Sequence, residues 1–273
     1  MTLDLTGAAW GCRIKDLHIC RRDDSGEISF ELALPEPMVI SAGPEATSML
    51  PVMGRSGAGK STLMNVLSTT AFPAPDAAQV EWRFPNGDSF HWSGNRRATI
   101  PLQYIRGRYF GYAFQQARLL RHLTVEENLI LGRINNGDKP ADARERVYNL
   151  MLPAFANDSA TVDRVLSLYP AELSGGEGQR VALLKAIARD PYVMFADEPT
   201  GSLDRDTRRE VMSLLREWVS ERPDERLLIW VTHHDRDPAD TGVLRRLWVA
   251  DGTARFEETS DGETWYPREA MHA

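Results

Sequence analysis

The chain has 273 residues, of which 42% are hydrophobic and 26% are charged, a composition typical of a globular protein with a substantial core. Its formal net charge is −7, so it repels a long phosphate backbone on average and no nucleic acid partner is expected. Cys12 and Cys20 form no CxxC pair and have no accompanying histidine ligands. They indicate neither a metal site nor a disulfide framework, and they fit a reducing cytoplasm.

The first ten residues contain an acidic residue, Asp4, and lack both a basic region and an apolar region of useful length. We therefore expect no secretory signal. No apolar run approaches the roughly 20 residues that a membrane-spanning helix requires. Work at a membrane would need a partner protein.

Residues 1–47 alternate charged and apolar positions, and Asp24, Ser25 and Gly26 make a plausible hairpin turn, which predicts a small antiparallel sheet. Short apolar runs of strand-like length follow, interleaved with helical patterns, at 48–53, 192–196, 227–231 and 246–250. This rhythm predicts a parallel sheet in an α/β core. Pro51 predicts a short or irregular first strand, because proline donates no ladder hydrogen bond.

The region 118–168, between the first two runs, is rich in helix formers, and Thr124 to Glu127 could serve as a capping box. It is predicted to be a helical subdomain inserted into the core. The segment 209–220 is predicted to form a helix that packs on the sheet. Its apolar residues at helical spacing are Val211, Leu214, Leu215 and Trp218.

The segment after the first run matches the phosphate-binding pattern GxxxxGK[ST] and precedes a predicted helix. Its glycines let backbone N–H groups face a polyphosphate, and the helix N-terminus adds positive potential. A chance glycine-rich turn is the alternative, but all eight positions match between a strand and a helix. Lys60 would reach the β- and γ-phosphates, and Ser61 would ligate Mg²⁺. The predicted phosphate-binding residues are Gly54, Arg55, Ser56, Gly57, Ala58, Gly59, Lys60, Ser61 and Thr62.

Further polar residues follow the next two runs, where open α/β sheets bind their ligands. Asp197 could hold Mg²⁺ through a water, and Glu198 could act as the general base on the attacking water, the Walker B arrangement. His233 could contact the γ-phosphate and support Glu198, although the adjacent His234 remains an alternative.

The run Leu173–Arg180, LSGGEGQR, resembles the signature of ABC ATPases, usually written LSGGQ. The resemblance continues through ADEPTGSLD at 196–204, which resembles the family's Walker B motif and D-loop, and His233 matches its switch histidine. The family fold is a P-loop NTPase core with a mainly parallel sheet, an N-terminal antiparallel β subdomain and an inserted α-helical subdomain. The activity implied is hydrolysis of ATP with Mg²⁺.

This resemblance implies one ABC ATPase domain over residues 1–273. Its expected parts are an antiparallel β subdomain at 1–47, a P-loop core at 48–117 and 176–252, a helical subdomain at 118–175 and a C-terminal tail at 253–273.

The run Gly111–Gln115 resembles the Q-loop, in which Gln115 would contact Mg²⁺ or the attacking water and sense a membrane partner; Gln116 is the less suitable residue. The segments 119–128 and 169–172, together with ADEPTG, are most similar to the lipoprotein-release, macrolide-export and cell-division ATPases. This likeness covers roughly residues 11 to 252. It implies a protein at the cytoplasmic face of the membrane that drives separate integral membrane permease subunits.

The resemblance also implies a head-to-tail dimer, as a homodimer or with another ABC ATPase, that closes around two ATP molecules. Ser174 and the N–H groups of Gly175 and Gly176 would form a second anion-binding helix end, joined by Glu177. The same residues also describe a simple helix start with Ser174 as N-cap.

Some positions depart from the family pattern. Glu177 replaces the usual glutamine, and Lys185 stands where arginine is frequent, so the energetics of dimer closure are expected to differ. The aromatic residue that usually stacks on adenine is missing from 19–22, where Arg21 could stack through its guanidinium plane or simply form an exposed salt bridge.

Two other functions are compatible with these motifs. LSGGE also occurs in ATPases that maintain DNA, but the chain has no heptad arrays or cysteine clusters, and its acidic balance disfavours DNA. A slowly hydrolysing scaffold of a membrane complex would carry the same motifs.

Overall fold

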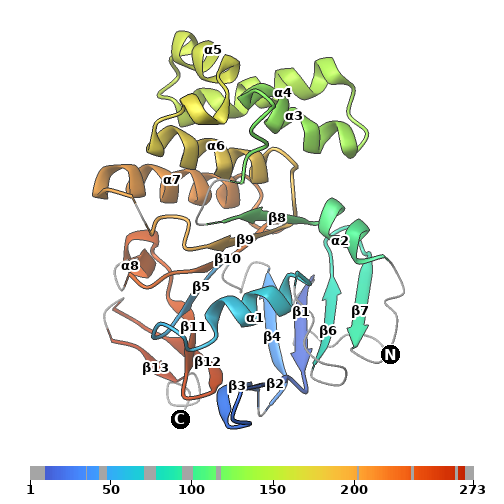
Figure 1. Ribbon diagram of the computed structural model, residues 1–273, viewed down its shortest axis with the longest axis vertical. Helices are drawn as coiled ribbons and strands as arrows, with labels where there is room; N and C mark the ends of the chain where they lie inside the picture. Colours follow the sequence, from blue (N-terminus) through green and yellow to red (C-terminus); the bar gives the residue numbers. More distant parts are fainter. Residues whose placement is uncertain are drawn as a thin grey trace.

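The computed structural model describes residues 10–34, 36–42, 48–70, 78–93, 101–114, 118–201, 203–234, 237–261 and 264–267. Two sheets form the lower part of the molecule in Figure 1, and a group of helices forms the upper part. None of the helices in these ranges has the length and apolar character needed to cross a bilayer.

The larger sheet has nine strands in the order β2-β3-β12-β11-β5-β10-β9-β8, with β13 paired to β12. Strands β11, β5, β10, β9 and β8 run parallel to one another. The bounds are β2 His18–Arg22, β3 Ile28–Ala33, β5 Met49–Met53, β8 Phe110–Ala113, β9 Val193–Asp197, β10 Leu227–Val231, β11 Arg245–Ala250, β12 Thr253–Glu258 and β13 Tyr266–Pro267. The four predicted runs are therefore β5, β9, β10 and β11, each placed within one residue, and the parallel α/β core is confirmed.

Strand β5 is regular through Pro51, so the expected irregularity is wrong. The carbonyl of Ser48 accepts from Leu228 of β10, and that of Val52 accepts from Thr232, directly after β10. Even-numbered residues of β5 therefore bond toward β10, and the odd-numbered Pro51 faces β11. Pairing of β5 with β11 begins only at Val52. The missing N–H of Pro51 therefore removes no ladder hydrogen bond.

The smaller sheet is antiparallel, with the order β4-β1-β6-β7. Its strands are β1 Trp10–Lys15, β4 Met38–Ala42, β6 Gln79–Arg83 and β7 Ser89–Ser93. Trp82 fixes this sheet to the core, because its indole nitrogen donates to the Leu67 carbonyl at 3.0 Å and its ring packs edge-on to Phe110 and Phe195. Helix α1, Lys60–Leu67, lies on this side of the larger sheet.

Two predicted boundaries differ from the structure. The antiparallel sheet expected within 1–47 takes half of its strands from residues 79–93, and the predicted hairpin, β2–β3, joins the larger sheet instead. Pairing between β1 and β6 spans about 70 residues and leaves no local sequence signal. The tail expected from residue 253 contains β12 and β13. Asp251 and Gly252, with φ of 50° and 71°, form the two-residue turn that joins β11 to β12.

Helices α3 Val125–Asn135, α4 Pro140–Ala154 and α5 Ser159–Ser167 form the predicted helical region. They share an apolar core with α6, which contributes Val181 and Leu184, and they lie farthest from the smaller sheet (Figure 1). Helices α6 Gly175–Ile187 and α7 Arg205–Glu221 separate them from the sheet, and the short α2 Leu102–Arg108 and α8 Asp237–Thr241 lie beside it. The predicted face of α7 is confirmed, since Val211, Leu215 and Trp218 are buried and Leu214 is partly buried.

Asn128 organises the entry to the helical region. It is fully buried, accepts from the Leu120 N–H at 2.8 Å and donates to the carbonyls of Leu120, Leu123 and Thr124 at 2.9 to 3.2 Å. The predicted capping box at Thr124 and Glu127 is present. Lys185 of α6 donates to the Asn128 amide oxygen at 3.3 Å, so this one amide ties residues 120–124 to α3 and α6.

Replacing Asn128 by alanine is therefore expected to lower the free energy of unfolding by about 2 to 3 kcal/mol, because buried backbone groups would lose their partner. Urea unfolding measures this change. Glu126→Gln, on the same helix and exposed in part, is the matched control and should change the stability by less than about 0.5 kcal/mol. Equal effects of the two substitutions would contradict the assignment.

Candidate active site

The phosphate-binding segment forms the loop between β5 and α1. Gly54, Gly57 and Gly59 have φ of 143°, 78° and 108°. A Cβ at Gly54 would lie 2.0 Å from the Val249 carbonyl oxygen, so the close approach of β11 requires glycine there. Gly59 is the N-cap of α1, and no side chain caps this helix end. The first N–H groups of α1 thus point to a site suited to an anion.

Lys60 lies across this loop. Its Nζ donates to the carbonyl oxygens of Gly54 at 2.8 Å and Arg55 at 2.9 Å, and the residue is buried. Burial lowers the pKa of Lys60, while the negative charges of Glu198 and Asp197 raise it. The loop therefore contains the positive charge of the Lys60 ammonium, and the negative charges of Asp197 and Glu198 partly offset it.

Ser61 and Asp197 meet although they are 136 residues apart in the chain. The Ser61 hydroxyl donates to Asp197 Oδ1 at 3.2 Å. Burial raises the pKa of Asp197, and the hydrogen bond from Ser61 lowers it. Two oxygen ligands side by side fit Mg²⁺, which proteins bind through few carboxylates together with substrate phosphates. In the part of the chain described, no group of three or more His, Cys, Asp or Glu residues could hold a metal alone.

Glu198 and His233 also come together, because β9 and β10 are neighbouring parallel strands with Val231 opposite Asp197. His233 Nδ1 lies 3.5 Å from Glu198 Oε1. Glu198 has a positive φ of 47°, which is uncommon for a residue with a side chain and marks a constrained backbone. The ion-pair contact belongs to His233, whereas His234 packs against the His233 ring with centroids 4.2 Å apart.

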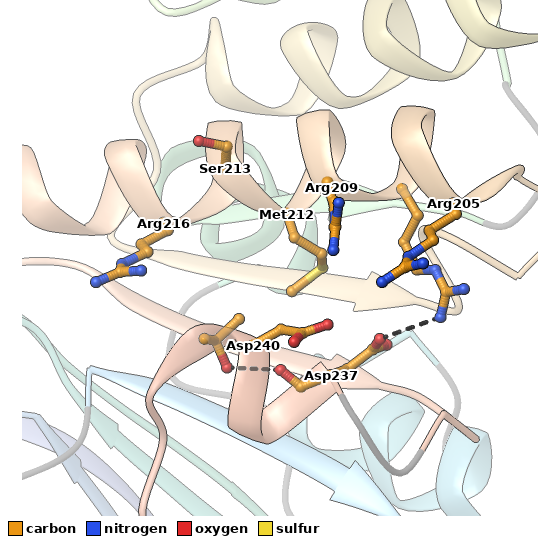
Figure 2. Close-up of a pocket in the computed structure, with 9 residues that line it drawn as sticks. Arg205, Arg209, Met212, Ser213, Arg216, Asp237 and Asp240 are labelled. Atoms are coloured by element: carbon orange, nitrogen blue, oxygen red, sulfur yellow. Dashed lines mark hydrogen bonds and ion pairs between the residues drawn. The ribbon is translucent and has the colours of Figure 1, made fainter.

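The histidine loop is supported by Asp237, which the sequence analysis missed. This carboxylate is 2% exposed and accepts from the Thr232 hydroxyl at 2.6 Å. Arg208 of α7 lies 3.7 Å from its other oxygen. Figure 2 shows Asp237 on α8 beneath the arginine-bearing face of α7. Thr232, the residue before His233, is thus held by a buried carboxylate that also pairs with α7, and the contact between Asp237 and Arg208 leaves no local sequence pattern.

The signature segment forms the N-terminal end of α6, which begins at Gly175. Ser174 caps the helix, and Gly175 and Gly176 open it; among the described residues, neither of these glycine N–H groups has an acceptor. Gln179 of the same helix donates to the Pro199 carbonyl at 2.7 Å. Figure 1 places α6 and α1 on opposite sides of β8, β9 and β10, so this helix end does not face the phosphate loop of its own chain.

Glu177 engages both of its carboxylate oxygens. Oε1 accepts from Arg164 of α5 at 2.5 Å, and Oε2 accepts from the Ser174 N–H and hydroxyl at 2.9 and 2.7 Å. Together with the Glu177 N–H bond to the Ser174 hydroxyl, this is a capping box. The bond from Arg164, followed by those from Ser174, lowers the pKa of Glu177 to about 2.

Arg21 and Phe30 are directly opposite each other in the β2–β3 hairpin. The Arg21 guanidinium lies 5.4 Å from the centre of the Phe30 ring, and within the ranges given above Arg21 has no ion pair. A Cβ at Gly59 would lie 2.9 Å from the Phe30 ring, so this ring touches the phosphate loop. Phe30 is a site residue that the sequence analysis missed. Gln115 and Gln116 lie outside the described residues.

Comparisons with known proteins identify the family to which the chain is similar. A family model described as ABC transporter matches residues 40–201. The chain is 31% identical over 239 residues to the ABC transporter ATP-binding protein YxdL of Bacillus subtilis (strain 168), covering 87% of this chain and 83% of that protein. It is 33% identical over 216 residues to the macrolide export ATP-binding/permease protein MacB 2 of Aeromonas hydrophila subsp. hydrophila, covering 78% of this chain but only 30% of that protein.

Solved structures share the fold. The dimeric structure of MJ0796, a bacterial ABC transporter cassette, has a TM-score of 0.69 and 25% identity, covering 90% of this chain and 98% of that chain. The dimeric post-hydrolysis state of the same cassette, bound to ADP and Pi, has a TM-score of 0.69 and 24% identity, with the same coverage.

The ionised Glu177 should make stability depend on pH. Because its folded pKa of about 2 is below its usual value of 4.5, its contribution is complete above the usual value and is lost as the pH falls toward 2. Glu177→Gln retains a capping side chain but not the charge, so it should lower Tm by about 2 °C near neutral pH. The gap should shrink as the pH is lowered below about 4. An identical gap at pH 7 and pH 3 would contradict this account.

Proposed function

The chain belongs to the ABC transporter family of ATP-binding proteins, and from that membership we propose that two copies close head to tail around two ATP molecules and drive separate membrane-embedded permease subunits. The chain binds and hydrolyses ATP. The pairing, the role of each residue and the membrane partner are the proposal.

Phosphate binding is assigned to the loop 54–59 and the N-terminal end of α1. Their N–H groups bind the phosphate oxygens, and Lys60 exchanges the carbonyls of Gly54 and Arg55 for oxygens of the β- and γ-phosphates. Ser56, within the loop, and Thr62, in the first turn of α1, take part in this binding. Arg21, supported by the Phe30 ring, provides a flat cationic surface for the adenine base.

Ser61 and Asp197 are assigned to Mg²⁺, with Gln115 as the further contact that the family resemblance implies. When bound, Mg²⁺ supplies positive charge that offsets the charge developing on the β- and γ-phosphate oxygens.

Hydrolysis is assigned to Glu198 with His233. Glu198 accepts a proton from the water that attacks the γ-phosphorus, and the bond from phosphorus to the bridging oxygen of ADP breaks as the new bond forms. His233, 3.5 Å from Glu198, keeps this carboxylate directed toward the water and contacts the γ-phosphate. The products are ADP and phosphate.

The observation that carries the pairing is the position of the signature. Among the residues that the structure describes, the N–H groups of Gly175 and Gly176 at the N-terminal end of α6 have no acceptor, and this end lies on the other side of the sheet from α1. A head-to-tail pair brings this end against the phosphate loop of the other copy, so that two helix ends hold one γ-phosphate. The dimeric state of the MJ0796 cassette supports pairing of two copies. The pair is a homodimer or a heterodimer with another ABC ATPase.

The membrane partner is inferred from two facts. The chain belongs to the ABC transporter family, and the name of MacB 2 joins an ATP-binding part to a permease part in one protein. We assign the matching permease role here to separate chains, which places this protein at the cytoplasmic face of a membrane. The helical region at 118–175 and Gln115 pass the motion of the dimer to those chains.

Replacing Glu198 by glutamine should lower ATP turnover by a factor of about 10² to 10⁴, because the general base is lost, while ATP binding is retained. Phosphate release measures the first effect, and equilibrium binding of ATP measures the second. His234→Gln, which alters the neighbour that does not pair with Glu198, is the control and should have the smaller effect. Unchanged hydrolysis by the Glu198→Gln protein would refute the role of Glu198.

Cross-linking tests the head-to-tail pairing. In a Glu198→Gln, Cys20→Ser background, one sample carries Ser56→Cys in the phosphate loop and another carries Gly175→Cys at the start of α6. Both positions are exposed, and a Cβ at Gly175 meets nothing within 4 Å. Mixing the two with ATP should give a disulfide-linked dimer, whereas each alone should give none. Equal cross-linking without ATP, or by one variant alone, would contradict the arrangement.

A further inference from the structure

The carboxylate of Glu177 lies at the helix end that our proposed function assigns to the γ-phosphate of the other copy. It holds the Ser174 hydroxyl at 2.7 Å and the Ser174 N–H at 2.9 Å through one oxygen, Oε2. Two donors that could bind an incoming phosphate are therefore already used by an anion of the same chain. Only the N–H groups of Gly175 and Gly176 remain without an acceptor in the described structure.

A second anion at one helix end is disfavoured electrostatically. A carboxylate in the first turn already satisfies the positive end of the helix dipole, and its negative charge repels a phosphate brought to the same end. Such repulsion is strongest where closure of two surfaces removes water and counterions. Unless another charge opposes it, Glu177 would weaken the closed dimer.

Arg164 supplies that charge. It belongs to α5, outside the signature, and its Nη2 lies 2.5 Å from the other carboxylate oxygen of Glu177. The Glu177 side chain is 14% exposed and that of Arg164 is 53% exposed, so the guanidinium covers the carboxylate on its solvent side. With Arg164 attached, Glu177 and Arg164 together carry no net charge.

We propose that Arg164 and Glu177 form an electrostatic latch that sets how tightly the signature end of α6 holds the ATP of the other copy. The latch rests on the proposed head-to-tail dimer. Arg164 cancels the charge of Glu177 and holds its Oε1, while the Ser174 hydroxyl turns from Oε2 to the γ-phosphate. Both are positioning residues, since they act through Ser174 and through charge, and closure is weaker than it would be with a neutral side chain at position 177.

The test measures the dissociation constant of the ATP-bound dimer by sedimentation in the Glu198→Gln background. Glu177→Gln should tighten the dimer, and Arg164→Ala should weaken it, each by about three- to tenfold. Glu177→Gln added to Arg164→Ala should restore the affinity at least to that of the parent. The loss caused by Arg164→Ala should shrink as salt is raised. Arg144→Ala, which removes a similar exposed ion pair with Glu126, should change nothing.

The outcomes separate the latch from a purely structural role. Glu177→Gln is expected to lower Tm slightly and yet to strengthen dimer formation. Loss of a stabilising contact alone would lower Tm without strengthening the dimer. If Arg164→Ala does not fold, the Glu177→Gln protein decides alone, because glutamine can still cap α6. The latch would be overturned if the parent forms the ATP-bound dimer but Glu177→Gln does not tighten it. It would also be overturned if adding Glu177→Gln to Arg164→Ala does not restore the affinity. Absence of ATP-dependent pairing in the parent would instead overturn the proposed dimer.

Discussion

The active site depends on the parallel pairing of β5, β10 and β9. Trp230 in the middle strand lies opposite Pro51 on one side and Ala196 on the other. The phosphate loop, Asp197 and Thr232, which lie at the carboxyl ends of these three strands, are therefore at the same edge of the sheet. β5, β10 and the apolar part of β9 are buried throughout. A slip of β9 by one position would draw Asp197 toward this core, where an unpaired carboxylate is costly. Burial of the strands therefore fixes the alignment of the groups to which we assign catalysis.

The groups gathered at this edge depend on one another's charge. Burial lowers the pKa of Lys60 and raises that of Asp197, so burial by itself disfavours the charged form of each residue. The negative charge of Asp197 raises the pKa of Lys60, and the positive charge of Lys60 lowers the pKa of Asp197, so each offsets the effect of burial on the other. The negative charge of Glu198 raises the pKa of both. Such opposed groups, together with the positive φ of Glu198, are typical of sites kept for their chemistry and not for stability.

The sequence predicted what local patterns encode. Strand-length apolar runs, the glycine spacing at Gly54 to Lys60 and the cap at Thr124 are all read within a few residues, and they located the core, the phosphate loop and the helical region. Contacts between distant segments were not predictable, and they include β1 with β6, Asp237 with Arg208, and Arg164 with Glu177. Strand β12 was missed although it could have been predicted, because Asp251-Gly252 is a local hairpin signal. The contact of Phe30 with the phosphate loop could not be predicted without the register of the β2–β3 hairpin.

The two helix ends assigned to ATP differ in a way that separates their tasks. α1 has Gly59 as its N-cap, has no side-chain cap and carries no acidic residue in its first turn, so no carboxylate of its own helix end competes with phosphate for its N–H groups. α6 begins with a hydroxyl already bonded to a carboxylate, which leaves a weaker anion site. In the proposed cycle the dimer opens after each turnover, which suits a strong site that retains the nucleotide together with a weaker one that releases it. The acidic residue in the signature is therefore consistent with a clamp whose reversibility comes from α6, while affinity for the nucleotide comes from α1.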